Sequence, residues 1–394
     1  MENKYLTISN VGDCKKFLSD LNSSSYVLNI KIQDDNYDCL KYLVEHSQDL
    51  KNGVKIINLT LPYEMMPKKD FEVLYNLWAN FPNTKCNVSV GHRYVEDDRF
   101  IDNKGTVMWD LKTIIKANTS IYDVCNFIKS KKLSPFEAYA YVHKYVSTIA
   151  QYNASSAGGT WLSYDQYFPG AFFDLPEVVC MGYASLEKEI IDNLDMPGLK
   201  CDIVSVSFYN KDKYTTDKHA RCVVRVLDEK YGINQSCFED PTWDNIDTKT
   251  DKVSMYAHFA MNLDCHERRT NDKYDYYCPS IVELSPKHTK SIVDLTSRWE
   301  YNKSKNPISQ LQIEKAYFNV LSKSNPKQSF DSLYATLAKM AKQSYDEQIL
   351  RRFKGNLTQE TPLLTKQMAK QIFDENQKTL SDFNVDDIDS AQQL

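Results

Sequence analysis

Strand-like and helix-like segments alternate along the chain as far as Val90, and this alternation limits the folds that are possible. Strands are predicted at Tyr26–Ile32, Val54–Leu61 and Cys86–Val90, with apolar residues at helical spacing between them. A β-α-β-α-β order predicts a parallel sheet. The strands recur about every 30 residues, a period that also suits a short βα solenoid of leucine-rich-repeat type. An open sheet and a solenoid both fit the pattern.

The pattern changes near Lys116, so we divide the chain into segments 1–116, 117–278 and 279–394. In the second segment, Asn118 and Pro135 have the residue types of helix starts. Three strands are expected there, near Cys201–Phe208, His219–Leu227 and Tyr231–Glu239. The third segment is helical and polar, and its acidic tail is expected to fray. The overall class is therefore α+β.

Composition argues against several classes of partner. The 394 residues carry a net charge of -5, without a basic run, so a nucleic-acid partner is not expected. The N-terminus lacks the pattern of a secretory signal, and no apolar run approaches the roughly 20 residues of a membrane span. We expect a soluble cytoplasmic protein, although secretion without a classical signal, or a leader already removed, would leave no trace in this sequence.

Ten cysteines are spread evenly along the chain, and most are expected to be reduced and buried. Cys265, His266 and Cys278 have donor atoms, but their spacing matches no standard zinc pattern. No calcium loop of EF-hand type is present. The sequence therefore predicts neither a metal nor a cofactor.

Cys180 lies where a helix is predicted to begin, in V-V-C-M-G-Y-A. The unsatisfied amide groups at a helix N-terminus favour a thiolate, which is the form that acts as a nucleophile. Taken alone, this cysteine is better explained as the first residue of the buried face of its helix than as a nucleophile. Its interpretation depends on which groups lie nearby.

Two predicted strands carry a histidine and a carboxylate. His219 lies at the entrance of one strand, and Asp240 ends the next, where Pro241 stops the hydrogen-bond ladder. A turn centred between Glu229 and Lys230 would place His219 directly opposite Asp240. A carboxylate at that distance orients an imidazole and stabilises its protonated form.

The three blocks V-C-M-G-Y-A, His219-Ala220 and Asp240-Pro241-Thr242-Trp243, in this order, resemble the transglutaminase-like superfamily of thiol enzymes. The resemblance covers roughly Ser134 to His266. It implies a papain-like core, in which a nucleophile helix packs on an antiparallel sheet, within segment 117–278. It also implies that Cys180 is the nucleophile, His219 the general acid and base, and Asp240 the orienting carboxylate. The chain departs from the family pattern at Val178 and at Ala220.

Other residues near these blocks have weaker assignments. A second oxyanion donor is sought among Tyr152, Trp161, Tyr164 and Gln166, each of which fits packing or loop polarity as well. Trp243 suits either the wall of an acyl-binding groove or the core. The remaining residues are expected to pack in the interior as inert groups: His143, His258, His266, Cys201, Cys222 and Cys237.

The resemblance implies attack by Cys180 on an amide carbonyl of a protein or peptide substrate. Water would then resolve the thioester, as in a cysteine peptidase or deamidase, or an amine would do so, as in a transglutaminase. The alternative is an interaction protein built on an inactive or occluded scaffold of the same type. The first and third segments could then recognise partners.

Overall fold

The structure is a computed structural model, and it describes most of the chain. The described residues are 3–20, 25–32, 37–50, 53–61, 68–90, 108–149, 151–153, 177–210, 215–245, 255–261, 270–271, 274–275, 307–350 and 357–381. The predicted loop Ala154–Gly170 and all of the acidic tail after Ser381 lie outside these ranges.

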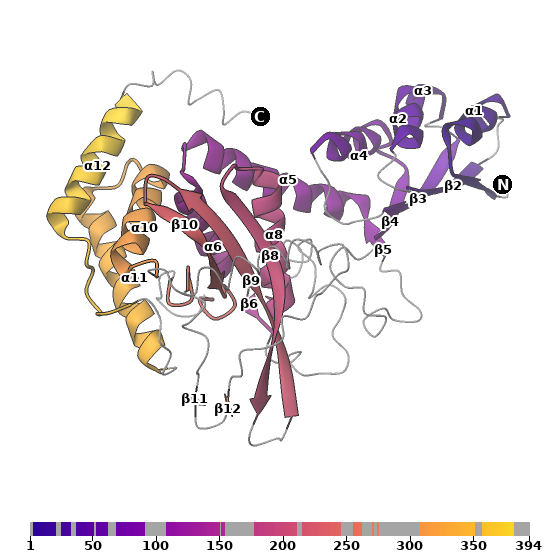
Figure 1. Cartoon of the computed structure of the whole chain (residues 1–394). Helices are drawn as coiled ribbons and strands as arrows, with labels where there is room; N and C mark the ends of the chain where they lie inside the picture. Colours follow the sequence, from indigo (N-terminus) through magenta and orange to yellow (C-terminus); the bar gives the residue numbers. More distant parts are fainter. Residues whose placement is uncertain are drawn as a thin grey trace.

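The N-terminal part is a five-stranded sheet in which neighbours in the sequence are neighbours in space (Figure 1). Its strands are β1 (Asn3–Ile8), β2 (Ser25–Lys31), β3 (Val54–Leu61), β4 (Lys85–Val90) and β5 (Met108–Asp110). The helices between them are α1 (Val11–Ser19), α2 (Asp38–Glu45), α3 (Ser47–Leu50) and α4 (Lys68–Asn80). Strands β1 to β4 are parallel, and β5 is antiparallel to β4. Because right-handed crossovers in this order place successive helices on one face, the sheet has the topology of a βα solenoid.

An asparagine ladder crosses the middle of this sheet. Asn58 donates its amide to the Asn29 side chain at 2.8 Å and accepts a hydrogen bond from Asn87 at 2.8 Å. Successive members are 29 residues apart in the sequence and pair in register. The same polar side chain thus recurs at the same point of the three successive strands β2, β3 and β4, a repeat that the apolar residues alone did not reveal.

Helix α5 (Leu111–Ser130) connects the two halves of the molecule (Figure 1). The prediction of a helix start at Asn118 is wrong, because the helix runs through this residue without a break. Asn118 is buried, and its amide donates to the Ile114 carbonyl at 2.9 Å inside the helix. Leu111 and Ile115 pack in the N-terminal core, while Ile121 and Ile128 pack in the second core. The apolar face thus continues on both sides of Asn118 and keeps the helix continuous.

The second half holds an antiparallel sheet with the strand order β10-β9-β8-β12-β11. Its strands are β8 (Leu199–Asn210), β9 (Thr215–Asp228), β10 (Ile233–Glu239), β11 (Thr270–Asn271) and β12 (Tyr274–Asp275). The short strands β6 (Gln151–Tyr152) and β7 (Glu177–Val178) pair in parallel. The helices are α6 (Pro135–Ile149), α8 (Cys180–Leu194), α10 (Gln310–Ser324), α11 (Phe330–Leu350) and α12 (Lys366–Ser381). The described part of the chain is therefore mixed α+β, with a mainly parallel sheet, an antiparallel sheet and the small parallel pair β6–β7.

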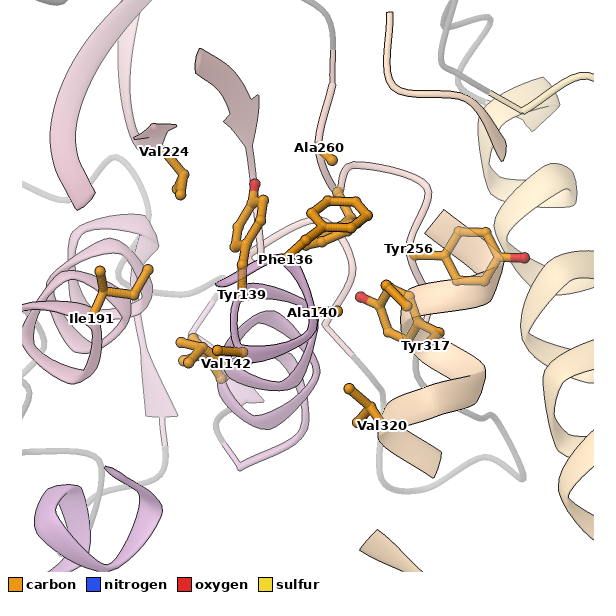
Figure 2. Packing of buried hydrophobic residues seen from close by; sticks show 14 of the residues in the cluster. Phe136, Tyr139, Ala140, Val142, Ile191, Val224, Tyr256, Ala260, Tyr317 and Val320 are labelled. Atoms are coloured by element: carbon orange, nitrogen blue, oxygen red, sulfur yellow. The ribbon is translucent and has the colours of Figure 1, made fainter. Parts of the chain in front are cut away.

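Helix α6 lies at the centre of the second core, between α8 with its sheet on one side and α10 on the other (Figure 2). Its aromatic residues Phe136 and Tyr139 are fully buried and pack on Phe259, with a Tyr139–Phe259 ring separation of 4.3 Å. Tyr317 of α10 packs on Tyr256 at 5.1 Å. The C-terminal helices thus share one hydrophobic core with the antiparallel sheet. None of the described helices is long and apolar enough to cross a membrane.

Candidate active site

Cys180 is the first residue of α8. Val179 precedes it in an extended conformation and offers no side-chain hydrogen bond to cap the helix. The first amide groups of a helix have no acceptor within the helix. They therefore create a local positive potential beside the Cys180 sulfur, where an anion is stabilised.

The neighbours of Cys180 also favour a thiolate. The Ala220 amide donates to the Cys180 sulfur at 3.4 Å. Burial alone would raise the pKa of this thiol, but the charge of His219 and a hydrogen bond with it, together with the Ala220 amide, hold the pKa below its ordinary value. The surroundings of Cys180 therefore favour its thiolate over its thiol form.

The other described cysteines are more deeply buried, and several of them have a raised pKa. Seven of the eight are buried, and Cys180 is the exception with intermediate exposure. Burial raises the pKa of Cys125 to about 11 and of Cys237 to about 12. Cys222, predicted to be inert in a strand, is also buried, and its pKa is well above the ordinary value. Among the described cysteines, Cys180 alone combines solvent exposure with a lowered pKa.

His219 lies in β9 and pairs with Asp240, which directly follows β10. Its Nε2 atom is 2.6 Å from the Asp240 Oδ2 atom, and both side chains are buried. Burial alone would lower the pKa of His219, but the charges of Asp240 and Cys180 raise it to about 10. Because Nε2 faces the carboxylate, Nδ1 is the ring nitrogen left for the thiol. The three residues therefore form a connected row of thiol, imidazole and carboxylate.

The strand register that produces this contact differs from the prediction. Glu239 pairs with Cys222, so the position after it would face Arg221, and His219 is not directly opposite Asp240. The loop extends to Gly232, whose φ of +64° is left-handed, and this moves the centre of the turn by one residue. The resulting change in register is two residues. Since side chains alternate with a period of two, His219 and Asp240 stay on one face and meet diagonally.

Pro241 and Trp243 fix the position of the carboxylate. Pro241 begins a turn that is closed by a hydrogen bond from the Trp243 amide to the Asp240 carbonyl at 3.1 Å. The Asp240 amide donates to the His258 carbonyl at 3.1 Å. The Trp243 ring packs edge-on against His219, with 5.9 Å between ring centroids. Trp243 therefore packs against one side of the imidazole.

Tyr152 is the one oxyanion candidate among the described residues, since Trp161, Tyr164 and Gln166 lie outside them. It belongs to β6, beside β7, which leads into Cys180. Its side chain is partly exposed, and burial, with the nearby charges of Cys180 and Asp240, raises its pKa to about 12. The phenol thus keeps its proton at neutral pH and can donate a hydrogen bond.

A second group of ionisable side chains lies deeper, and the sequence interpretation missed it. His143 of α6 is buried as expected, but its ring joins two carboxylates: Nδ1 is 3.2 Å from Glu239, and Nε2 is 3.1 Å from Asp244. Asp244 also accepts hydrogen bonds from the His258 ring at 2.9 Å and from its backbone amide at 2.8 Å. Burial opposes the charge on His143, but the two carboxylates raise its pKa to about 9.

Glu187 lies beside this group. One of its carboxylate oxygens, a ring nitrogen of His143 and a carboxylate oxygen of Glu239 all lie within 4.8 Å of one another. Glu187 follows Cys180 by two helical turns, on the apolar face of α8, and is fully buried. An acidic residue at a core position was the signal in the sequence that could have pointed to this group. Cys265, His266 and Cys278 lie outside the described residues.

No protein-family model matches the chain, and no curated protein is detectably similar to it. The function of the chain is therefore inferred from the geometry of the site.

Proposed function

We propose that the chain is a thiol enzyme of transglutaminase-like type that acts on amide bonds of proteins or peptides. The observation that carries the proposal is the row of side chains formed by Cys180, His219 and Asp240. Cys180, at one end of this row, is the only described cysteine that is not buried. The resemblance to a papain-like core adds to this. In support, helix α8, which begins with Cys180, packs on the antiparallel strands β8 and β9, an arrangement of the kind that the resemblance implies.

The chemistry begins with the Cys180 thiolate, which attacks the carbonyl carbon of an amide and forms a C–S bond. Amide groups at the start of α8, with the Tyr152 hydroxyl as a second donor, stabilise the oxyanion of the tetrahedral intermediate. When the C–N bond breaks, the imidazolium of His219 gives its proton to the leaving amine. The products of this half-reaction are a free amine and a thioester on Cys180.

The second half-reaction resolves the thioester. Water gives a proton to His219, adds to the thioester carbonyl and releases a carboxylic acid together with the thiolate. An amine in place of water would give a new amide. We favour water, because no amine-binding surface stands out in the sequence.

The state of the cysteines supports a reducing location. All eight described cysteines are free thiols, as is usual for proteins of the cytoplasm. A cytoplasmic location is therefore part of the proposal. The proposed reaction itself uses no cofactor, and its substrate is a protein or peptide rather than a nucleic acid.

The test is the reactivity of Cys180 towards limiting iodoacetamide from about pH 5 to pH 9, with the labelled cysteine mapped by mass spectrometry. We expect Cys180 to react fastest and to keep its reactivity below pH 7. In the His219→Ala variant this low-pH reactivity should disappear, because burial then raises the thiol pKa without an opposing charge. Equal reactivity of Cys180 in both proteins would contradict the proposal.

A second candidate function is protein recognition by the N-terminal sheet. The observation in its favour is the asparagine ladder, whose residues Asn29, Asn58 and Asn87 are only partly buried and lie on one face of a solenoid-like sheet. Solenoids use such regular faces to bind partners. An unreactive Cys180 in a correctly folded chain would favour this function over catalysis.

A further inference from the structure

The buried group beside the proposed active site points to a metal centre, and this inference does not depend on the proposed function. His143, Glu187 and Glu239 come from α6, α8 and the end of β10, and all three side chains are fully buried. One ligand atom from each lies within 4.8 Å of the others. We propose that these three residues bind one divalent transition-metal ion of the Zn²⁺ type.

Glu187 provides the independent reason for an ion. Neither of its carboxylate oxygens has a hydrogen-bond partner among the described residues, although the side chain is fully buried. Buried charges are normally paired or bound to a metal, because leaving water without compensation is costly. The Glu187 carboxylate lies beside His143 and Glu239, where a cation would compensate its charge.

The donor set selects the class of ion. One imidazole nitrogen and two carboxylate oxygens suit first-row ions such as Zn²⁺, whereas Mg²⁺ and Ca²⁺ prefer oxygen ligands alone. Zinc binds these donors at about 2.0–2.2 Å. The three ligand atoms lie within 4.8 Å of one another, whereas the ligand atoms of a tetrahedral zinc site are roughly 3.4 Å apart, so the site must contract to bind the ion. Rotation of the Glu187 side chain, which no hydrogen bond anchors, would bring its carboxylate to the ion.

The charges also balance around an ion. The two glutamates neutralise a divalent cation when the Nδ1 atom of His143 binds as a neutral ligand, with the ion in place of its proton. The Nε2 atom of His143 would then donate to Asp244, at the 3.1 Å already present. A carboxylate on the far nitrogen of a metal-bound histidine is a common means of fixing its orientation. Asp244 is held in turn by His258.

The ion would have a structural role, because its three ligands are closed off from solvent. It would join α8, which begins with Cys180, to the end of β10, where Glu239 precedes Asp240. It would also attach both elements to α6. The metal would therefore hold together the elements that carry Cys180 and Asp240. It would not itself contact a substrate.

The test measures metal content and thermal unfolding of the full chain. All proteins carry Cys180→Ala, so that the active-site thiol cannot hold an ion. They are produced in zinc-supplemented medium and dialysed before multi-element mass spectrometry. We expect about one equivalent of Zn²⁺ per chain, as for a closed structural site. Addition of EDTA should lower the Tm by roughly 5–10 °C, the shift for an ion present at about a hundred times its Kd.

Glu187→Gln removes a ligand charge while keeping the size of the side chain, and Glu189→Gln is the matched control, since Glu189 is equally buried on the same helix. We expect Glu187→Gln to lose the zinc and its sensitivity to EDTA, and Glu189→Gln to retain both. The proposal is overturned if Glu187→Gln holds as much zinc as the control. It is also overturned if the parent chain holds no metal and EDTA leaves its Tm unchanged, a result that decides the matter even if Glu187→Gln does not fold. Neither readout involves Cys180 reactivity, so failure of the metal site and failure of the proposed enzyme are distinguishable.

Discussion

Replacing Asp240 by Asn tests how the carboxylate controls the thiol. The amide has the same shape, and the backbone hydrogen bonds of Asp240 to His258 and Trp243 remain possible. What is lost is the charge that lies 2.6 Å from the Nε2 atom of His219. A hydrogen bond to a charged group contributes about 1.5–3 kcal/mol. The imidazolium, and with it the thiolate, should therefore be disfavoured by roughly 10- to 150-fold.

The assay is the rate of Cys180 alkylation near pH 6, where an ordinary thiol reacts slowly. We expect the Asp240→Asn rate to fall by one to two orders of magnitude, and the difference from wild type to shrink at higher pH, where the thiol ionises without help. Asp228→Asn is a suitable control, because Asp228 is a buried carboxylate of the same hairpin that binds the Phe136 amide at 2.8 Å, far along β9 from His219. It should lower stability without changing the alkylation rate. An unchanged rate in Asp240→Asn, with normal folding, would refute the reasoning.

Three further predictions concern stability, each measured by urea denaturation. Asn58→Ala breaks two hydrogen bonds of the ladder and should cost about 1–2 kcal/mol; a neutral effect would show that the ladder does not stabilise the sheet. Gly198→Ala should cost about 1–3 kcal/mol, because φ is +87° and a Cβ would lie 2.5 Å from the Leu227 carbonyl oxygen; normal stability would contradict this conformation. In a Cys180→Ala background, the stability from the His219–Asp240 pair should be complete below pH 6.5 and should decrease as the pH rises towards the folded pKa of His219, about 10 in the wild type. A stability that increases over this interval would mean that the imidazole is not held protonated.

Local patterns identified most of the framework of the site. The strand Val54–Leu61 is predicted with its observed bounds, and Cys180 does begin a helix. Periodicity and turn residues carry this information, because they depend on neighbours a few positions away. Asn118 was misleading for the same reason. Its residue type suits a helix start, but the apolar face on both sides buries α5 as one helix.

For the contact between His219 and Asp240, the sequence predicted the shared face of the two side chains but not the exact strand register. The predicted turn is centred one residue too early, because the observed loop extends to Gly232 with its left-handed φ of +64°. Tyr231 in this loop is buried, and its hydroxyl lies 2.9 Å from Glu137, in a contact with α6 that the hairpin sequence does not contain. The two side chains remain on the same face, because the resulting shift in register is an even number of residues. The sequence therefore determined that the two groups share a face, and the tertiary structure decided that they meet diagonally.

The sequence by itself predicted the long strands of both sheets and the helix that begins at Cys180, and it indicated the three residues of the proposed active site. Only the tertiary structure brought Glu187 to His143 and Glu239, and only it separated Cys180 from the seven buried cysteines. The physical reason is that burial and charge compensation depend on which elements pack together. Packing brings together residues that are far apart in the chain, whereas local periodicity depends only on residues a few positions apart and so does not reveal these contacts.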